Sequence, residues 1–255
     1  MKALILFLIS STVFSGILSS DPTNYMIDEF ETTSSEINEL KFNKVVMEIY
    51  SLYIQKALKN KLKLRVHTNW SSPYFSAWAS KKQDIYKINF WGGLARINSM
   101  TLESWEFIVC HEIGHILGGK PKMRIKGHSW ASAEGQADHF AITECLPNYY
   151  KTFKKTKDTQ TYIQDLDYYK CFSMDDTNKC IRVLNAGHAF SNVLEFLNHD
   201  KNILKATYDK TAPHVLNTLF DSYPSNQCRL DIFNKNATCD NKSLCERNLC
   251  WFSKD

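Results

Sequence analysis

The segment His111-Glu112-Ile113-Gly114-His115 constrains this chain more than any other, because it forms an HExxH motif. Residues four apart on an α-helix project about 40° from one another, so His111 and His115 can reach one metal ion. Glu112 then projects beside the metal, where its carboxylate can act as a base. The motif therefore predicts one zinc ion per chain, bound from a helix that also carries the general base.

The residues around the motif predict a helix whose other side is buried. Thr101 is suited to be its N-cap, and Gly118-Gly119 followed by Pro121 predict its end. At 100° per residue, the apolar residues cluster on the face opposite the histidines. They are Trp105, Val109, Ile113, Ile116 and Leu117. We therefore expect the histidines to look into a cleft from a helix buried on its far side.

A zinc hydrolase of this type needs a third protein ligand. A metzincin would have a histidine six residues after His115, but Pro121 occupies that position. Glu134 and Asp138 are again four residues apart and share a face of a second predicted helix. Glu134 can complete a His/His/Glu ligand set, and Asp138 can orient a ligating histidine by accepting its other ring N–H. The alternative third ligands are His128 and His139.

These blocks resemble the HtpX/BepA-type gluzincin zinc metallopeptidases. In that family HExxH is followed on a later helix by ExxxD, usually with alanine before the aspartate, as in Glu134–Ala137–Asp138. A third block is also similar, since the family has a His-Pro pair with an arginine six residues after the histidine. Here the pair is Tyr223-Pro224, followed by Arg229, so tyrosine stands in place of the family's histidine.

The resemblance implies a zinc endopeptidase in which the block from Tyr223 to Arg229 supplies a hydrogen-bond donor to the reaction's oxyanion. The catalytic residues would then be Glu112, Tyr223 and Arg229. Two alternatives remain open: Arg229 can form an ion pair with a carboxylate near the metal, and Tyr223 can simply pack beneath the cleft. His188 is a further candidate donor. A different class of function is a catalytically weak zinc-binding chaperone or peptide-binding protein on the same fold.

The N-terminus is typical of a cleavable signal peptide, with Lys2, an apolar run over residues 3–14 and small residues up to Ser20. Its removal leaves residues 21–255 as one domain of ordinary size. We therefore expect a secreted or periplasmic protein without stable membrane insertion. The net charge of +4 is too small to indicate nucleic acid, so the expected partner is a peptide or protein substrate. The oligomeric state is left open.

All eight cysteines lie beyond this segment, and an even number in an exported chain favours disulfides. Cys171 and Cys180 bracket a short polar loop and form the easiest local pair to predict. Cys110 is expected to be a core residue or a disulfide partner. Four cysteines make the C-terminal segment disulfide-rich: Cys228, Cys239, Cys245 and Cys250. A second zinc site there is the rival interpretation, but their spacings contain no CxxC pair.

Hydrophobic periodicity predicts the remaining elements. Helices are expected at residues 36–59, with a capping box from Thr33 to Glu36, and at residues 181–199. Strands are expected at residues 62–66 and 86–90. The resemblance to gluzincins implies that the second strand edges the cleft and can pair with an extended peptide. The fold class is therefore α+β, a mainly helical zincin-like domain with a small sheet beside the active-site cleft.

Overall fold

The computed structural model describes residues 15–16, 26–28, 35–153, 169–172, 174, 176–197, 205–239 and 245–254. Helices make up most of the regular structure and are joined by one small mixed sheet, so the chain is α+β as expected. The predicted signal peptide falls outside the described residues except for Ser15–Gly16, and Thr33 also falls outside. None of the described helices is long and apolar enough to cross a membrane.

The sheet has the strand order β1-β3-β4-β2. Strand β4 (Ile85–Trp91) lies between β2 (Lys63–Asn69), which runs parallel to it, and β3 (Ala77–Lys82), which runs antiparallel. The two-residue strand β1 (Ser15–Gly16) pairs with the outer edge of β3. The second predicted strand, residues 86–90, is β4. The prediction that it forms an edge is wrong, because β4 has a neighbouring strand on each side.

Strand β3 had no counterpart in the predicted elements. Its sequence, Ala-Trp-Ala-Ser-Lys-Lys, contains no β-branched residue and so gives a weak strand signal. Its burial nevertheless alternates: Ala77 and Ala79 are buried, whereas Trp78 and Ser80 are partly exposed. The buried alanines belong to the core, and helix α3 packs against β3, where their small side chains allow a close approach.

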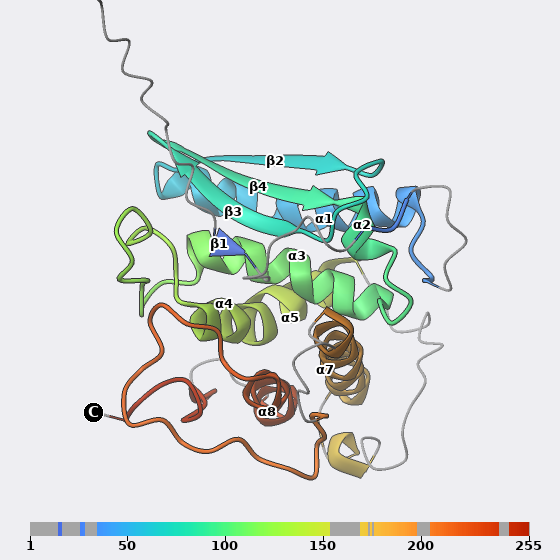
Figure 1. Ribbon diagram of the computed structural model, residues 1–255, viewed down its shortest axis with the longest axis vertical. Helices are drawn as coiled ribbons and strands as arrows, with labels where there is room; N and C mark the ends of the chain where they lie inside the picture. The colour runs from blue at the N-terminus through green and yellow to red at the C-terminus, as the bar shows by residue number, and fades with distance from the viewer. Residues whose placement is uncertain are drawn as a thin grey trace, which may run out of the picture.

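Helix α1 (Glu39–Lys59) covers the sheet from behind in Figure 1, and the four-residue helix α2 (Gly92–Ala95) follows β4 directly. The α1 helix begins three residues later than predicted. Its cap is Asn38, whose side chain accepts the Lys41 N–H at 2.9 Å, so the Thr33–Glu36 capping box is wrong as the start of this helix. Glu36 instead accepts the backbone N–H of Leu102, in the first turn of α3.

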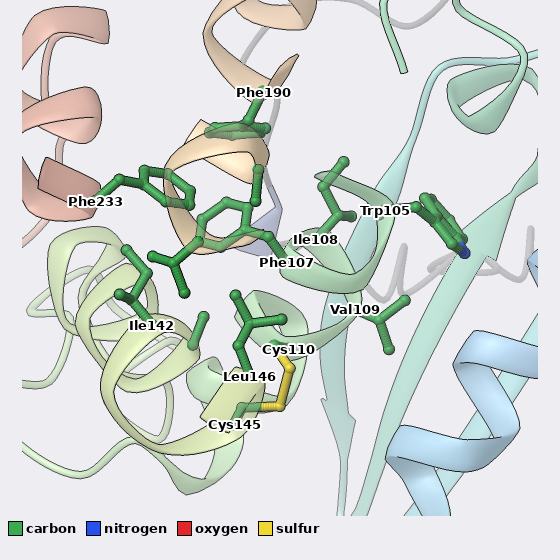
Figure 2. Close-up of a cluster of buried hydrophobic side chains, with 14 of the residues drawn as sticks. Trp105, Phe107, Ile108, Val109, Cys110, Ile142, Cys145, Leu146, Phe190 and Phe233 are labelled. Atoms are coloured by element: carbon green, nitrogen blue, oxygen red, sulfur yellow. A yellow bond between two sulfur atoms is a disulfide. The ribbon is translucent and has the colours of Figure 1, made fainter. Parts of the chain in front are cut away.

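Helix α3 (Leu102–Leu117) carries the HExxH motif and crosses the middle of the molecule, between the sheet and the C-terminal helices (Figure 1). Thr101 caps it through a capping box with Ser104, and Gly118 ends it, as the sequence predicted. Figure 2 shows Phe107 on one flank against Phe190 and Phe233, and Trp105 on the sheet side. The Phe107 ring centroid lies 4.8 Å from that of Phe190 and 4.6 Å from that of Phe233.

The second predicted helix is also present. Helix α4 (Glu134–Phe140) continues through a π-helix, η2 (Ala141–Cys145), into helix α5 (Leu146–Phe153). Helix α7 (Thr177–Leu197) matches the helix predicted at 181–199, with an earlier start. Helix α8 (Asn226–Ala237), capped by Ser225, was not predicted and carries Arg229.

All eight cysteines form disulfides, so the alternative of a second zinc site at the C-terminus is wrong. The predicted local pair Cys171–Cys180 is confirmed. The other three bridges are Cys110–Cys145, Cys228–Cys250 and Cys239–Cys245. Four disulfides indicate that the protein folds in an oxidising, extracellular type of environment.

Candidate metal centre

The two histidines of the motif are held in one orientation by their ring nitrogens. His111 Nδ1 lies 2.7 Å from Asp138 Oδ1, and His115 Nδ1 lies 2.9 Å from the backbone oxygen of Ser132. An N–H at each Nδ1 can donate to these oxygens, which leaves each Nε2 with its lone pair available. Both side chains are therefore arranged to bind a cation through Nε2.

Glu134 brings a carboxylate to the same point from the first turn of α4. Its Oε2 lies 3.2 Å from His111 Nε2, and its Oε1 lies 3.6 Å from His115 Nε2. Among the described residues, His111, His115 and Glu134 form the group that could hold a metal ion, with ligand atoms within 4.8 Å of one another. The predicted ligand set is thus brought together, whereas His128 and His139 do not belong to this group.

The hydrogen bonding of these atoms fits a metal better than it fits a self-contained cluster. His111 Nε2 and both Glu134 oxygens are buried, and apart from the contacts among themselves they make no hydrogen bond in the described part of the chain. Nitrogen and oxygen atoms bound at about 2.0–2.1 Å to a tetrahedral zinc ion lie roughly 3.3 Å apart, close to the spacings seen here. Buried polar atoms without partners are costly unless a ligand satisfies them.

Glu112 lies beside the ligands without joining them. Both of its carboxylate oxygens are buried without a side-chain partner in the described structure, and a contact with the Ala79 backbone N–H on β3 opposes part of the rise in pKa that burial causes. Ala79 is also the residue of β3 that pairs with Ser15. The two-residue strand β1 therefore pairs with β3 at the residue whose backbone contacts Glu112. The side chains of the three ligand residues and of Glu112 are at most 1% exposed. The centre is therefore more enclosed than the cleft that the sequence predicted.

The electrostatics of the metal-free protein show how tightly these groups are coupled. Burial lowers the pKa of His111, but the Asp138 and Glu134 carboxylates outweigh it and raise that pKa to about 9. Burial lowers the pKa of His115 to about 4 and raises the pKa of Glu112 to about 8. A bound cation would favour the deprotonated form of every one of these groups.

Asp138 connects the ligands to α8. Its Oδ1 accepts from Arg229 Nη2 at 2.6 Å and also contacts His111, and both partners outweigh burial and hold the pKa of Asp138 below its usual value. Arg229 is buried, and its guanidinium lies over the Phe190 ring, 4.7 Å from the centroid. The structure therefore shows the ion pair that was the alternative role for Arg229. Arg229 contacts Asp138, and Asp138 in turn contacts His111.

The other candidate residues are outside the group that could hold a metal ion and make contacts of their own. Tyr223 precedes α8 and is half-buried, and it is one of the groups that raise the pKa of Arg229 against the effect of burial. The His188 ring on α7 packs against Tyr208, with centroids 4.3 Å apart. His128 is buried in the loop after α3, near Trp130. The oxyanion role of Tyr223 stays a prediction.

Gly114, inside the HExxH motif, has a role that the sequence reasoning missed. A Cβ on Gly114 would lie 2.8 Å from the Ala137 backbone oxygen and 3.0 Å from its Cα. Only the missing side chain lets α3 and α4 approach closely enough for Glu134 to reach the histidines. A helix-interior glycine costs about 1 kcal/mol relative to alanine, and that cost is the signal that could have pointed to this contact.

We expect Gly114→Ala to lower both stability and metal affinity. The added methyl must push α4 away, and overpacking of this kind costs about 1–3 kcal/mol, more than the gain in helix propensity. Thermal unfolding and chelator competition would measure the two effects. Gly187→Ala is the control, because its Cβ would collide with Tyr208 and Phe233 instead. If Gly114→Ala binds metal as tightly as the wild type, close helix approach does not set the ligand geometry.

Comparisons with protein-family models, with curated proteins and with solved structures found no match for this chain. The family resemblance therefore rests on the sequence blocks alone, and the chemistry of the site has to be argued from its own residues.

Proposed function

We propose that this protein is a zinc-dependent endopeptidase that resembles the HtpX/BepA-type gluzincins. The observation that carries the proposal is the convergence of His111 Nε2, His115 Nε2 and the Glu134 carboxylate on one buried point, with the buried Glu112 carboxylate on the same helix. Two imidazoles and one carboxylate are a ligand set typical of catalytic zinc. When bound in such a site, zinc polarises a water molecule and lowers its pKa to about 7.

Glu112 is suited to move the proton that peptide hydrolysis requires. It does not belong to the ligand group, and no other side chain in the described structure hydrogen-bonds its oxygens. It can accept a proton from the attacking water and deliver it to the leaving amine. A protein that only bound zinc and peptide would have no need of such a carboxylate, and this argues against the chaperone alternative.

An extended peptide is the substrate form that suits the sheet. The outer edge of β3 offers backbone N–H and C=O groups beside Glu112, and a peptide can add to such an edge as a further strand. Ser15 and Gly16 pair with this edge at Ala79 and Trp78. Both residues belong to the predicted signal peptide, so its removal after export would free the edge for a substrate.

The site of action follows from the same residues. The four disulfides require an oxidising environment, and the N-terminal segment is typical of a signal for export. We therefore propose that the mature protein acts outside the cytosol on peptide or protein substrates.

One experiment tests the metal and the chemistry together. Purified protein, with the predicted signal peptide removed, is analysed for metal content and incubated with casein beside its Glu112→Gln variant. The proposal predicts stoichiometric zinc in both proteins and hydrolysis by the wild type alone. Wild-type protein that binds zinc but leaves casein and a peptide library intact would support the zinc-binding chaperone instead.

Tyr223→Phe tests the block in which the chain departs from its family. If the hydroxyl donates to the oxyanion, its loss lowers kcat by roughly 10²–10³-fold with little change in KM, because such a donor acts mainly in the transition state. Phenylalanine keeps the ring and its packing, so steady-state kinetics isolate the hydroxyl. Tyr223→His should recover much of the activity. An unchanged kcat in Tyr223→Phe would assign the tyrosine a packing role only.

A further inference from the structure

The Cys110–Cys145 disulfide joins the two helical segments that carry the metal ligands. Cys110 directly precedes His111 on α3, and Cys145 ends the π-helix η2, which continues from α4. The Cα atoms of the two cysteines are 5.6 Å apart, and the bridge closes a loop of 35 residues. Since all eight cysteines are paired, this is the one disulfide that links α3 to the α4–η2 segment.

The bridge lies within the core and away from solvent. Both cysteines are fully buried, and Figure 2 shows the bridge beside Leu146 and below Ile142 and Phe107. The same view shows that this cluster extends to Phe190 and Phe233, so α7 and α8 pack against the flank of α3 from which the bridge leaves. A change in the distance between α3 and η2 would therefore have to disturb both the core and the bridge.

Without a metal ion, one contact between α3 and α4 is incomplete. Asp138 keeps its contacts with His111 and Arg229. The buried Glu134 carboxylate, in contrast, meets His111 Nε2 at 3.2 Å and His115 Nε2 at 3.6 Å without a well-formed hydrogen bond in the described structure. Buried polar atoms without partners favour any motion that lets water reach them. Helix α4 continues through η2 into α5, but its N-cap residue, Ala133, makes no side-chain capping bond. The end of the segment that carries Glu134 therefore lacks one stabilising bond that helix starts commonly have.

We propose that the Cys110–Cys145 disulfide is a positioning element for the metal centre. It holds His111 against Glu134 and Asp138 in the metal-free protein, so that the metal ion meets ligands that are already assembled. Binding then does not have to offset the ordering of α4 against α3, and the affinity for the metal is higher than it would be without the bridge. The inference rests on the metal-binding part of the proposed function and not on peptide hydrolysis.

The test compares two disulfide-free variants by their zinc affinity. Cys110→Ala/Cys145→Ala removes the positioning bridge, and Cys171→Ala/Cys180→Ala removes a local bridge that joins neither ligand helix. Zinc affinity is measured by competition with a chromophoric chelator, and near-UV circular dichroism confirms the fold. We expect both variants to unfold at a lower temperature, because each loses a cross-link. Only the first should bind zinc more weakly, on the order of 10–100-fold, as for the loss of an outer partner of a ligand.

Hydrogen exchange distinguishes a local effect on α4 from a general loss of stability. In chelator-treated protein, the α4 amides should lose protection in Cys110→Ala/Cys145→Ala but keep it in the control, and added zinc should restore it. If the first variant does not fold, Cys110→Val/Cys145→Ala keeps more of the apolar volume and takes its place. Equal zinc affinity in wild type and bridge variant, or an equal loss in both variants, overturns the positioning role. Wild-type protein that binds no zinc overturns both this inference and the proposed function.

Discussion

Glu112→Gln is expected to lower kcat for peptide hydrolysis by roughly 10²–10⁴-fold, the range that general acid–base catalysis contributes. Glutamine keeps the size of the side chain but cannot accept and return a proton. Because Glu112 does not belong to the ligand group, zinc should remain bound. Burial raises the pKa of Glu112 to about 8, so burial disfavours its charged form, and an uncharged amide of the same size should leave stability unchanged or higher.

Steady-state kinetics on a peptide substrate, metal analysis and thermal unfolding check the three parts of this result. Glu39→Gln is the matched control, since it makes the same change at an exposed position of α1. The control should be indistinguishable from wild type. Activity near the wild-type level in Glu112→Gln would exclude Glu112 as the base and with it the proposed mechanism.

Glu134→Ala is expected to abolish stoichiometric zinc binding. The substitution removes one of three protein ligands, so the loss of affinity should exceed the roughly 10–100-fold that an outer partner such as Asp138 contributes. The two histidines keep their contacts with Asp138 and Ser132, and the fold should survive because α4 remains packed against α3. Chelator competition and metal analysis after gel filtration measure the effect.

Two further variants make this a graded series. Glu144 lies on the same continuous helical segment, where it forms an ion pair with Lys56. Glu144→Ala removes that ion pair and no ligand, so the variant should bind zinc with full affinity. Asp138→Asn should fall between the two, because it weakens the orientation of His111 without removing a ligand. Full zinc retention in Glu134→Ala would show that the ligand assignment is wrong and that another group, His128 or His139 among them, completes the site.

The ligand set was predictable because each half of it is local. His111 with His115, and Glu134 with Asp138, are four residues apart, and helix geometry alone places each pair on one face. The start of α3 at Thr101 and its end near Gly118 follow from capping in the same way. The Cys171–Cys180 pair was predictable because a nine-residue separation leaves little freedom in the choice of partner.

Strand β3 and the role of Gly114 were missed because their sequence signals are weak or depend on residues far away in the chain. Strand β3 has alanines where a strand ordinarily has β-branched residues, so only its pairing with β4 reveals it. Glycine at position 114 looks like a defect in a helix until Ala137 is seen against it. These residues make room for the close approach of backbone segments, and that need is visible only when both partners are in place.

The sequence by itself therefore determined the chemistry of the individual pieces: two imidazoles on one helix, a carboxylate between them in the sequence, and a carboxylate pair on a second helix. Tertiary structure alone decided how the pieces meet. It set Arg229 against Asp138 across 91 residues, brought Ala79 beside Glu112, and paired Cys110 with Cys145 among the possible partners. The physical reason is that the angular spacing of residues along one helix is fixed by its backbone, whereas contacts between distant segments depend on how the whole core packs.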